Sequence, residues 1–230
     1  MSRSLTPQST SSQIAAFLSE ARRLPVPGVA RGRLIFALDA TMSRQPTWDM
    51  ALGLQGRMFE AAAEVGGLDA QLVYFRGQGE CQASRFLSQG EGLADLMRGI
   101  SVRGGITQWR RTLAHARDEA RAARVGALVC VGDAMEENIE ELLALAGELA
   151  LVGVKAFMFQ EGDDKRAQKA FKEVARLTGG AYGAFDSGAA ARLATLLRAA
   201  AAYAAGGREA LVALAAREAE ARPLLAQMQG

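Results

Sequence analysis

The feature that most constrains the fold is a set of short apolar runs separated by longer segments with helical periodicity. The runs read LIFAL at 34–38, ALVCV at 127–131 and KAFMF at 155–159. A strand that is apolar at nearly every position is covered on both faces. Strands of this kind that alternate with helices predict right-handed crossovers and parallel pairing. We therefore expect an α/β fold, in which helices flank both faces of a Rossmann-like, open, mainly parallel sheet.

The remaining elements follow from the spacing of apolar residues and from glycine and proline breaks. Further strands are expected at 70–75, 82–86 and 182–185. Helices are expected at 48–65, 92–98, 108–124, 138–151, 165–177 and 189–203, with a final helix at 208–228 after Gly206 and Gly207. The expected organisation is a flexible segment with a short helix at 1–30, a folded domain at 31–205 and a C-terminal helix at 206–230.

Composition narrows the class of protein. Half of the 230 residues are hydrophobic, so the chain can bury a sizeable core. The net charge of +2 argues against general binding to nucleic acid, which needs a marked basic excess. Two cysteines do not suggest a disulfide scaffold, and no apolar stretch is long enough to cross a bilayer. We expect a soluble, cytoplasmic protein that contacts no membrane.

Polar side chains follow the apolar runs at the points where strands would end. Asp39, Thr41 and Ser43 follow the first run, Asp133 follows the second, and Thr107 precedes a helix. Ligands of open α/β sheets bind outside the carboxyl ends of the strands. An oxygen-only set suits Mg²⁺ or Mn²⁺ better than Zn²⁺. Each residue taken alone is also compatible with a helix cap or a loop acid.

The order of these residues resembles the von Willebrand factor type A (VWA) domain with its metal-ion-dependent adhesion site (MIDAS). DATMS at 39–43 is similar to the family's Asp-x-Ser-x-Ser motif, with a threonine in place of the first serine. GGIT at 104–107 is similar to its Gly-Gly-Thr loop with one inserted residue. GDA at 132–134 matches its Asp-Gly turn except that alanine replaces glycine, and GGAY at 179–182 resembles its late strand entry.

The resemblance implies a protein-binding module and no catalysis. In this family the hydroxyls contact the ion, the acids act mostly through water, and an acidic residue of a partner protein completes the coordination. The metal-site roles carry over to Asp39, Thr41, Ser43, Thr107 and Asp133. The expected cofactor is Mg²⁺ or Mn²⁺. The expected partner is a protein that offers an Asp or Glu, and the resemblance also suggests an assembly that involves an AAA+ ATPase.

Four residues near the expected site are candidates for contact with the partner. Trp48 and Trp109 follow two of the site loops, and Arg110 and Glu136 flank them. Aromatic residues at the rim of a site are frequent interface anchors. The alternative is that both tryptophans pack in the first turns of their helices and that both charges lie on solvated faces.

Two other functions are compatible with the same residues. A strand that ends in Asp, with an acidic loop such as GDAMEEN at 132–138, also occurs in haloacid dehalogenase-type phosphohydrolases. That reading is disfavoured because Thr41 stands where the second acid should be, and threonine cannot serve as a carboxylic general acid. The other alternative is an interaction module of the same fold that binds no metal.

Overall fold

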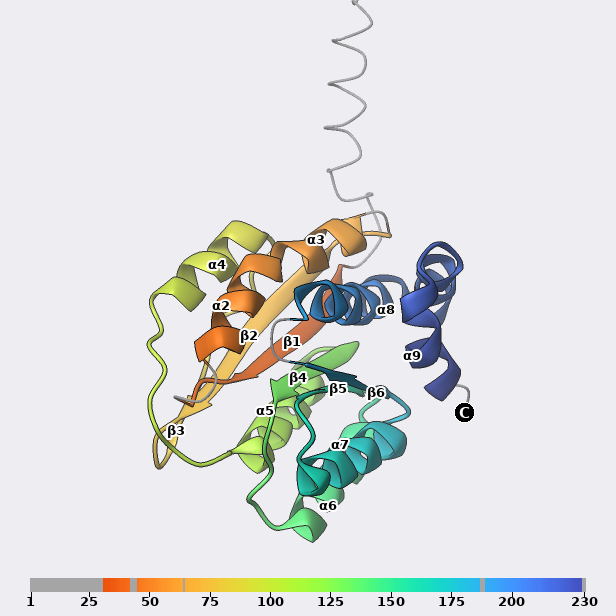
Figure 1. Cartoon of the computed structure of the whole chain (residues 1–230). Helices are drawn as coiled ribbons and strands as arrows, with labels where there is room; N and C mark the ends of the chain where they lie inside the picture. The colour runs from red at the N-terminus through yellow and green to blue at the C-terminus, as the bar shows by residue number, and fades with distance from the viewer. Residues whose placement is uncertain (1–30, 42–44, 64, 187–188, 229–230) are drawn as a thin grey trace, which may run out of the picture.

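The described part of the chain forms one six-stranded sheet in the order β3-β2-β1-β4-β5-β6 (Figure 1). The computed structural model describes residues 31–41, 45–63, 65–186 and 189–228, so the helix expected within 1–30 lies outside the described residues. All neighbouring strands are parallel except β2 and β3. The strands are β1 (Gly32–Asp39), β2 (Leu68–Arg76), β3 (Glu80–Ala83), β4 (Ala127–Gly132), β5 (Lys155–Glu161) and β6 (Ala181–Phe185).

Helices cover both faces of this sheet, as the apolar runs predict. Helices α2, α3, α4 and α8 lie on one face, and α5, α6 and α7 lie on the other (Figure 1). The helices are α2 (Gln45–Leu54), α3 (Gly56–Ala63), α4 (Gly90–Arg98), α5 (Trp109–Ala122), α6 (Ile139–Leu151), α7 (Lys165–Thr178), α8 (Ala190–Arg217) and α9 (Arg222–Gln227).

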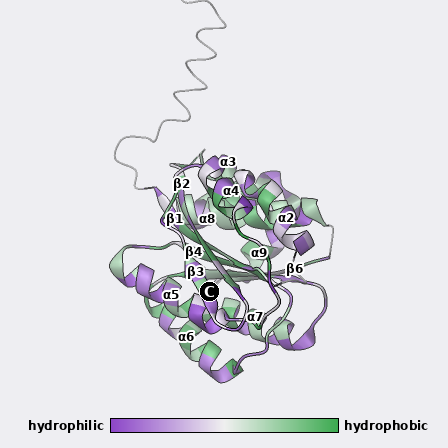
Figure 2. Cartoon of the chain, turned by 90° about the vertical axis from the view of Figure 1, so that its left-hand side faces the viewer, coloured by the Kyte–Doolittle hydropathy of each residue, from purple (hydrophilic) through white to green (hydrophobic). Residues whose placement is uncertain are grey.

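Strand β1 lies at the centre and divides the core into two layers. Leu34, Phe36 and Leu38 belong to the apolar cluster beneath α8, whereas Ile35 and Ala37 belong to the cluster beneath α5 and α6. This follows from the two-residue period of a strand. In Figure 2 the hydrophobic colouring accordingly runs through the central sheet, and the hydrophilic colouring lies mainly on the helices.

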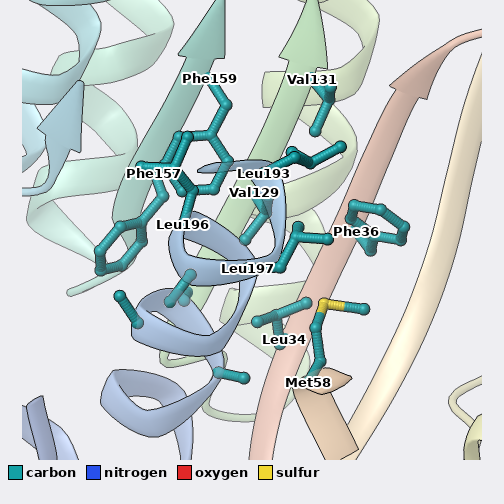
Figure 3. Packing of buried hydrophobic residues seen from close by; sticks show 14 of the residues in the cluster. Leu34, Phe36, Met58, Val129, Val131, Phe157, Phe159, Leu193, Leu196 and Leu197 are labelled. Carbon is teal, nitrogen blue, oxygen red and sulfur yellow. The ribbon is translucent and has the colours of Figure 1, made fainter. Parts of the chain in front are cut away.

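Helix α8 seals the first of these layers. Leu193, Leu196 and Leu197 are fully buried and point from α8 toward Phe36, Val129 and the phenylalanines of β5 (Figure 3). Their spacing of three and four residues places them on one face of the helix. Burying each leucine stabilises the fold by about 1.5–3 kcal/mol.

Two of the expected helices are interrupted in the structure. The helix expected at 48–65 is instead α2 and α3, which meet at Gln55 between two residues of poor helix propensity, Gly53 and Gly56. The final helix expected at 208–228 stops at Arg217. A short 3₁₀ turn follows, and α9 then begins with Pro223 in its first turn, where a missing backbone N–H costs least.

Other predicted boundaries agree more closely with the structure. The break at Gly206 and Gly207 is confirmed, since both residues have non-helical backbone angles within α8. Strand β3 comes two residues earlier than the expected 82–86, and it pairs antiparallel with β2.

The C-terminal segment covers one edge of the sheet. Gln227 of α9 accepts a hydrogen bond from the Tyr182 backbone N–H at 2.9 Å and donates to the Tyr182 carbonyl at 3.0 Å. Leu211, Leu214 and Leu224 are buried in the same cluster as the centre of the sheet. Residues 206–228 are therefore part of the folded body.

The part of the chain that the structure describes contains no helix with the length and apolar character needed to cross a membrane.

A pair of glycine substitutions tests the contact between α8 and β1. A β-carbon at Gly32 would lie 2.3 Å from the Ala204 carbonyl oxygen, whereas one at Gly147 in α6 would meet nothing within 4 Å. We expect Gly32→Ala to lower the free energy of unfolding by about 1–3 kcal/mol. Gly147→Ala should raise it by about 0.5–1 kcal/mol. Urea denaturation measures both, and an unaffected Gly32→Ala variant would show that this contact is absent in solution.

Candidate metal-binding site

The candidate site lies where the strand order of the sheet reverses. From β1 the chain crosses to β2 on one side, and from β4 it crosses to β5 on the other, while β1 and β4 pair with each other. The crevice at such a reversal is where open α/β sheets bind ligands. Asp39 is the last residue of β1, and Asp133 comes directly after β4. A β-carbon on Gly132 would lie 3.5 Å from that of Asp39, so the two strand ends are in close contact.

Asp39 organises the loop that follows β1. Its Oδ1 accepts the backbone N–H of Thr41 at 2.8 Å, and the two residues are 3% and 8% exposed. Between them, Ala40 donates its N–H to the Phe75 carbonyl and accepts the N–H of Arg103. The loop is thus fixed to β2 and to the segment that leads to Thr107. Ser43, the third predicted residue of this loop, lies outside the described residues.

Thr107 lies near the carboxyl ends of β1 and β4, on a segment without regular secondary structure. Its neighbour Ile106 donates its N–H to the Gly77 carbonyl at 3.2 Å, and a β-carbon at Gly105 would lie 2.3 Å from Gly77 backbone atoms. This close approach explains the glycine at 105. The residue inserted into the GGIT motif is accommodated because Ile106 turns outward, 45% exposed, while Thr107 is 3% exposed.

Trp109 packs against the end of β4 as a core residue. Its ring stands edge-to-face against Phe75 and Phe171, with centroids 4.7 and 5.3 Å away, and its Nε1 donates to the Ala134 carbonyl at 3.0 Å. A β-carbon on Gly132 would lie 2.5 Å from its Cζ2. Residue 132 must therefore be glycine, because a side chain at this position would overlap the Trp109 indole.

The structure corrects the expectation that the tryptophans form a binding rim. Trp109 is fully buried, and Trp48 is 2% exposed with its Nε1 donating to the Met97 carbonyl at 3.3 Å. Trp48 also stands edge-to-face to Tyr74. Both indoles occupy the first turns of their helices and face the sheet, because the apolar face of each helix includes that position. Neither is available to a partner in this conformation.

The two charged rim candidates are exposed, but both have partners within the chain. The Arg110 guanidinium pairs with Glu141 at 2.5 Å. The Glu136 carboxylate accepts the Thr107 N–H at 2.9 Å, and its own N–H donates to the Thr107 hydroxyl at 3.1 Å. Glu136 therefore holds Thr107 in place. The position of Glu136 in the sequence did not indicate this role.

The roles of a second glutamate and of a buried pair were also not predicted from the sequence. Glu137 accepts the backbone N–H groups of Trp109 and Arg110; burial raises the pKa of its carboxyl, and these hydrogen bonds oppose the rise. Glu161, at the end of β5, accepts the hydroxyl of Thr47, and both residues are buried. An acid in the last position of an apolar strand was the available sign of this pair.

Comparison with solved structures identifies the architecture. A von Willebrand factor type A protein from Catenulispora acidiphila aligns with 77% of this chain and 43% of its own, at 17% identity and a TM-score of 0.62. The SpRpn10 VWA domain aligns over 77% and 98% of the two chains, at 12% identity and a TM-score of 0.56. The ArnB paralog VWA2 from Sulfolobus acidocaldarius aligns over 76% and 46%, at 13% identity and a TM-score of 0.54.

The fold is that of a VWA domain. No protein-family model and no curated protein sequence matches the chain. The matched region spans less than half of the Catenulispora and Sulfolobus chains.

The donor set at this edge of the VWA fold suits a hard divalent cation. Among the described residues no cluster of three or more His, Cys, Asp or Glu side chains can hold a metal, so acids alone do not make a site. Asp39 and Asp133 instead stand at adjacent strand ends with Thr41 and Thr107 nearby, which supplies carboxylate and hydroxyl oxygens together. Such a set fits Mg²⁺ or Mn²⁺ and lacks the nitrogen and sulfur ligands that Zn²⁺ favours.

A substitution at Gly132 tests the packing of Trp109 against the end of β4. Because the far end of a rigid indole lies 2.5 Å from the added methyl position, we expect Gly132→Ala to lower the free energy of unfolding by about 1–3 kcal/mol. The indole N–H resonance of Trp109 should also shift as its bond to Ala134 is disturbed. Gly104→Ala, where nothing lies within 4 Å, is the matched control and should be neutral. Equal behaviour of the two variants would contradict this packing.

Proposed function

We propose that this chain is a divalent-metal-dependent protein-binding module. In this proposal a MIDAS-type site holds Mg²⁺ or Mn²⁺, and the ion accepts an acidic residue of a partner protein. The observation that supports it most is that Asp39 and Asp133 stand at the ends of the adjacent strands β1 and β4 of a VWA fold, where Asp39 accepts the Thr41 N–H and the loop after β4 is hydrogen-bonded to Thr107.

The residues divide into two roles toward the ion. The hydroxyls of Thr41 and Thr107, with that of Ser43, would contact it, and Asp39 and Asp133 would hold water around it. When bound, the ion supplies a Lewis acid with a coordination position open to an external carboxylate. Two acids and several neutral hydroxyls leave the ion short of negative charge, which favours a charged oxygen ligand. We propose a binding role and no catalytic role for these residues.

The surroundings of the site fit an acidic partner with an apolar neighbour. Arg103 is exposed, and its backbone N–H is bonded to Ala40 in the first site loop. Ile106, directly before Thr107, exposes nearly half of its surface. A carboxylate that approaches the ion would meet a positive charge and an apolar contact beside it. As part of this proposal, the partner belongs to an assembly that involves an AAA+ ATPase.

Metal-dependent stabilisation is the direct test of this function. We expect MgCl₂ to raise the melting temperature, because a ligand that binds only the folded state stabilises it by mass action. At an ion concentration ten times the Kd, the stabilisation is about 1.4 kcal/mol, or roughly 3–6 °C for a domain of this size. Thermal unfolding followed by circular dichroism, with NaCl matched for ionic strength, measures the shift.

Two variants make that measurement specific. Asp39→Ala should abolish the shift, whatever its own effect on stability. Asp163→Ala removes an exposed loop acid that follows β5 and should keep the full shift. The absence of a shift in the wild-type protein would reject the metal site.

Partner binding should depend on the ion. We expect affinity-tagged protein to recover a partner in Mg²⁺-containing buffer, to lose it in EDTA, and to regain it when Mg²⁺ is returned. Asp133→Ala should lose it in either buffer. A partner that stays bound in EDTA would favour a metal-free interaction module of the same fold.

A further inference from the structure

We propose that Glu136 and Glu137 are positioning residues that lock the loop of Thr107 to the loop of Asp133. This inference rests on the proposed metal site. It names the side chains that would hold the Thr107 and Asp133 loops in position for the ion. Neither glutamate is a ligand in this account. Both act through hydrogen bonds to the backbone around Thr107, and the Glu137 carboxylate also accepts a hydrogen bond from the Thr107 hydroxyl.

The first part of the lock is a reciprocal pair between Glu136 and Thr107. The Glu136 Oε2 accepts the Thr107 N–H at 2.9 Å, and the Glu136 N–H donates to the Thr107 Oγ at 3.1 Å. The two bonds fix both the backbone and the hydroxyl of Thr107. The hydroxyl oxygen keeps a lone pair for another interaction, because it accepts only one of these bonds.

The second part is the way Glu137 caps helix α5. This helix has no acidic residue in its first turn, and its N-cap residue, Gln108, makes no side-chain capping bond. Glu137 supplies the missing acceptor from the neighbouring loop, with Oε2 2.5 Å from the Trp109 nitrogen and Oε1 3.0 Å from the Arg110 nitrogen. A carboxylate at a helix N-terminus satisfies exposed N–H groups and complements the helix dipole.

Helix α7 holds the same loop from the other side. The Arg166 guanidinium donates to the carbonyls of Glu136 and Glu137 at 3.2 and 2.9 Å. Trp109 adds its own bond to the Ala134 carbonyl, next to Asp133. The loop that begins with Asp133 is thus tied to the start of α5, so hydrogen bonds of the protein itself hold Asp133 and Thr107 relative to each other.

Loss of such support is expected to weaken metal binding without removing a ligand. Residues that orient metal ligands typically contribute 10- to 100-fold to affinity. We therefore expect Glu137→Ala to raise the Kd for Mg²⁺ at least about 10-fold. Glu137→Gln keeps one oxygen acceptor and should have a smaller effect. Glu136→Ala, which frees the Thr107 N–H, should resemble Glu137→Ala and serves as the second test if that variant folds poorly.

The experiment measures Mg²⁺ affinity and backbone exchange in the same set of proteins. Isothermal titration with MgCl₂ gives the Kd. Hydrogen exchange in EDTA gives the protection of the Trp109 and Arg110 amides without metal. The control is Glu140→Gln, an exposed glutamate in the first turn of α6 whose carboxylate takes no part in the lock. We expect faster exchange of both amides and weaker Mg²⁺ binding in Glu137→Ala, with both unchanged in the control.

The outcomes separate this inference from the proposed function. If Glu137→Ala and Glu136→Ala bind Mg²⁺ with the same Kd as the wild-type protein, the inference is overturned while the proposed metal site stands. Unchanged amide exchange in Glu137→Ala would overturn it as well. A wild-type protein that binds no Mg²⁺ would reject the metal site and, with it, the positioning role.

Discussion

The parallel pairing of β1 with β4 is the contact on which the rest of the structure depends. Both strands are apolar on both faces, so each must lie inside the sheet with helices above and below. Their pairing puts the reversal of strand order at the centre of the molecule. It also brings Asp39 and Asp133 to neighbouring strand ends, although 94 positions separate them in the chain.

Hydrogen bonds from backbone N–H groups to carboxylates hold the loops around this crevice. Asp39 holds the Thr41 N–H, Glu136 holds the Thr107 N–H, and Glu137 holds the start of α5. Charge-assisted bonds of this kind are short and strong compared with exposed ion pairs. They fix the backbone of Thr41 and Thr107, and the Glu136 N–H also fixes the Thr107 hydroxyl; such support is what the proposed ion site would require.

Much of this arrangement could be predicted from the sequence, and the reason is local. The apolar runs predict the buried strands, and a polar residue directly after such a run must lie at the edge of the sheet, as Asp39 and Asp133 do. The split between α2 and α3 was missed because apolar periodicity continues through Gln55 while the glycines beside it interrupt the helix. The orientation of the two tryptophans could not be predicted for a different reason. A residue in the first turn of a helix can point its ring toward the sheet or toward solvent.

The roles of Glu136 and Glu137 could not be predicted, because they depend on contacts between distant segments. Each glutamate bonds to backbone atoms nearly thirty residues earlier in the chain. The sequence does not show which backbone atoms the fold will place beside a given side chain. From the sequence alone, both residues resemble solvated loop acids. Their contacts with the start of α5 and with Thr107 exist only in the folded chain. The inserted Ile106 shows the converse, since its exposure lets the motif differ in length while Thr107 stays buried.

Anomalous scattering from crystals grown with MnCl₂ would test the metal site most directly. The account predicts one anomalous peak at the carboxyl ends of β1 and β4, among Asp39, Thr41, Thr107 and Asp133, and its loss in Asp39→Ala crystals. The absence of any peak, or a peak only at another part of the surface, would contradict it.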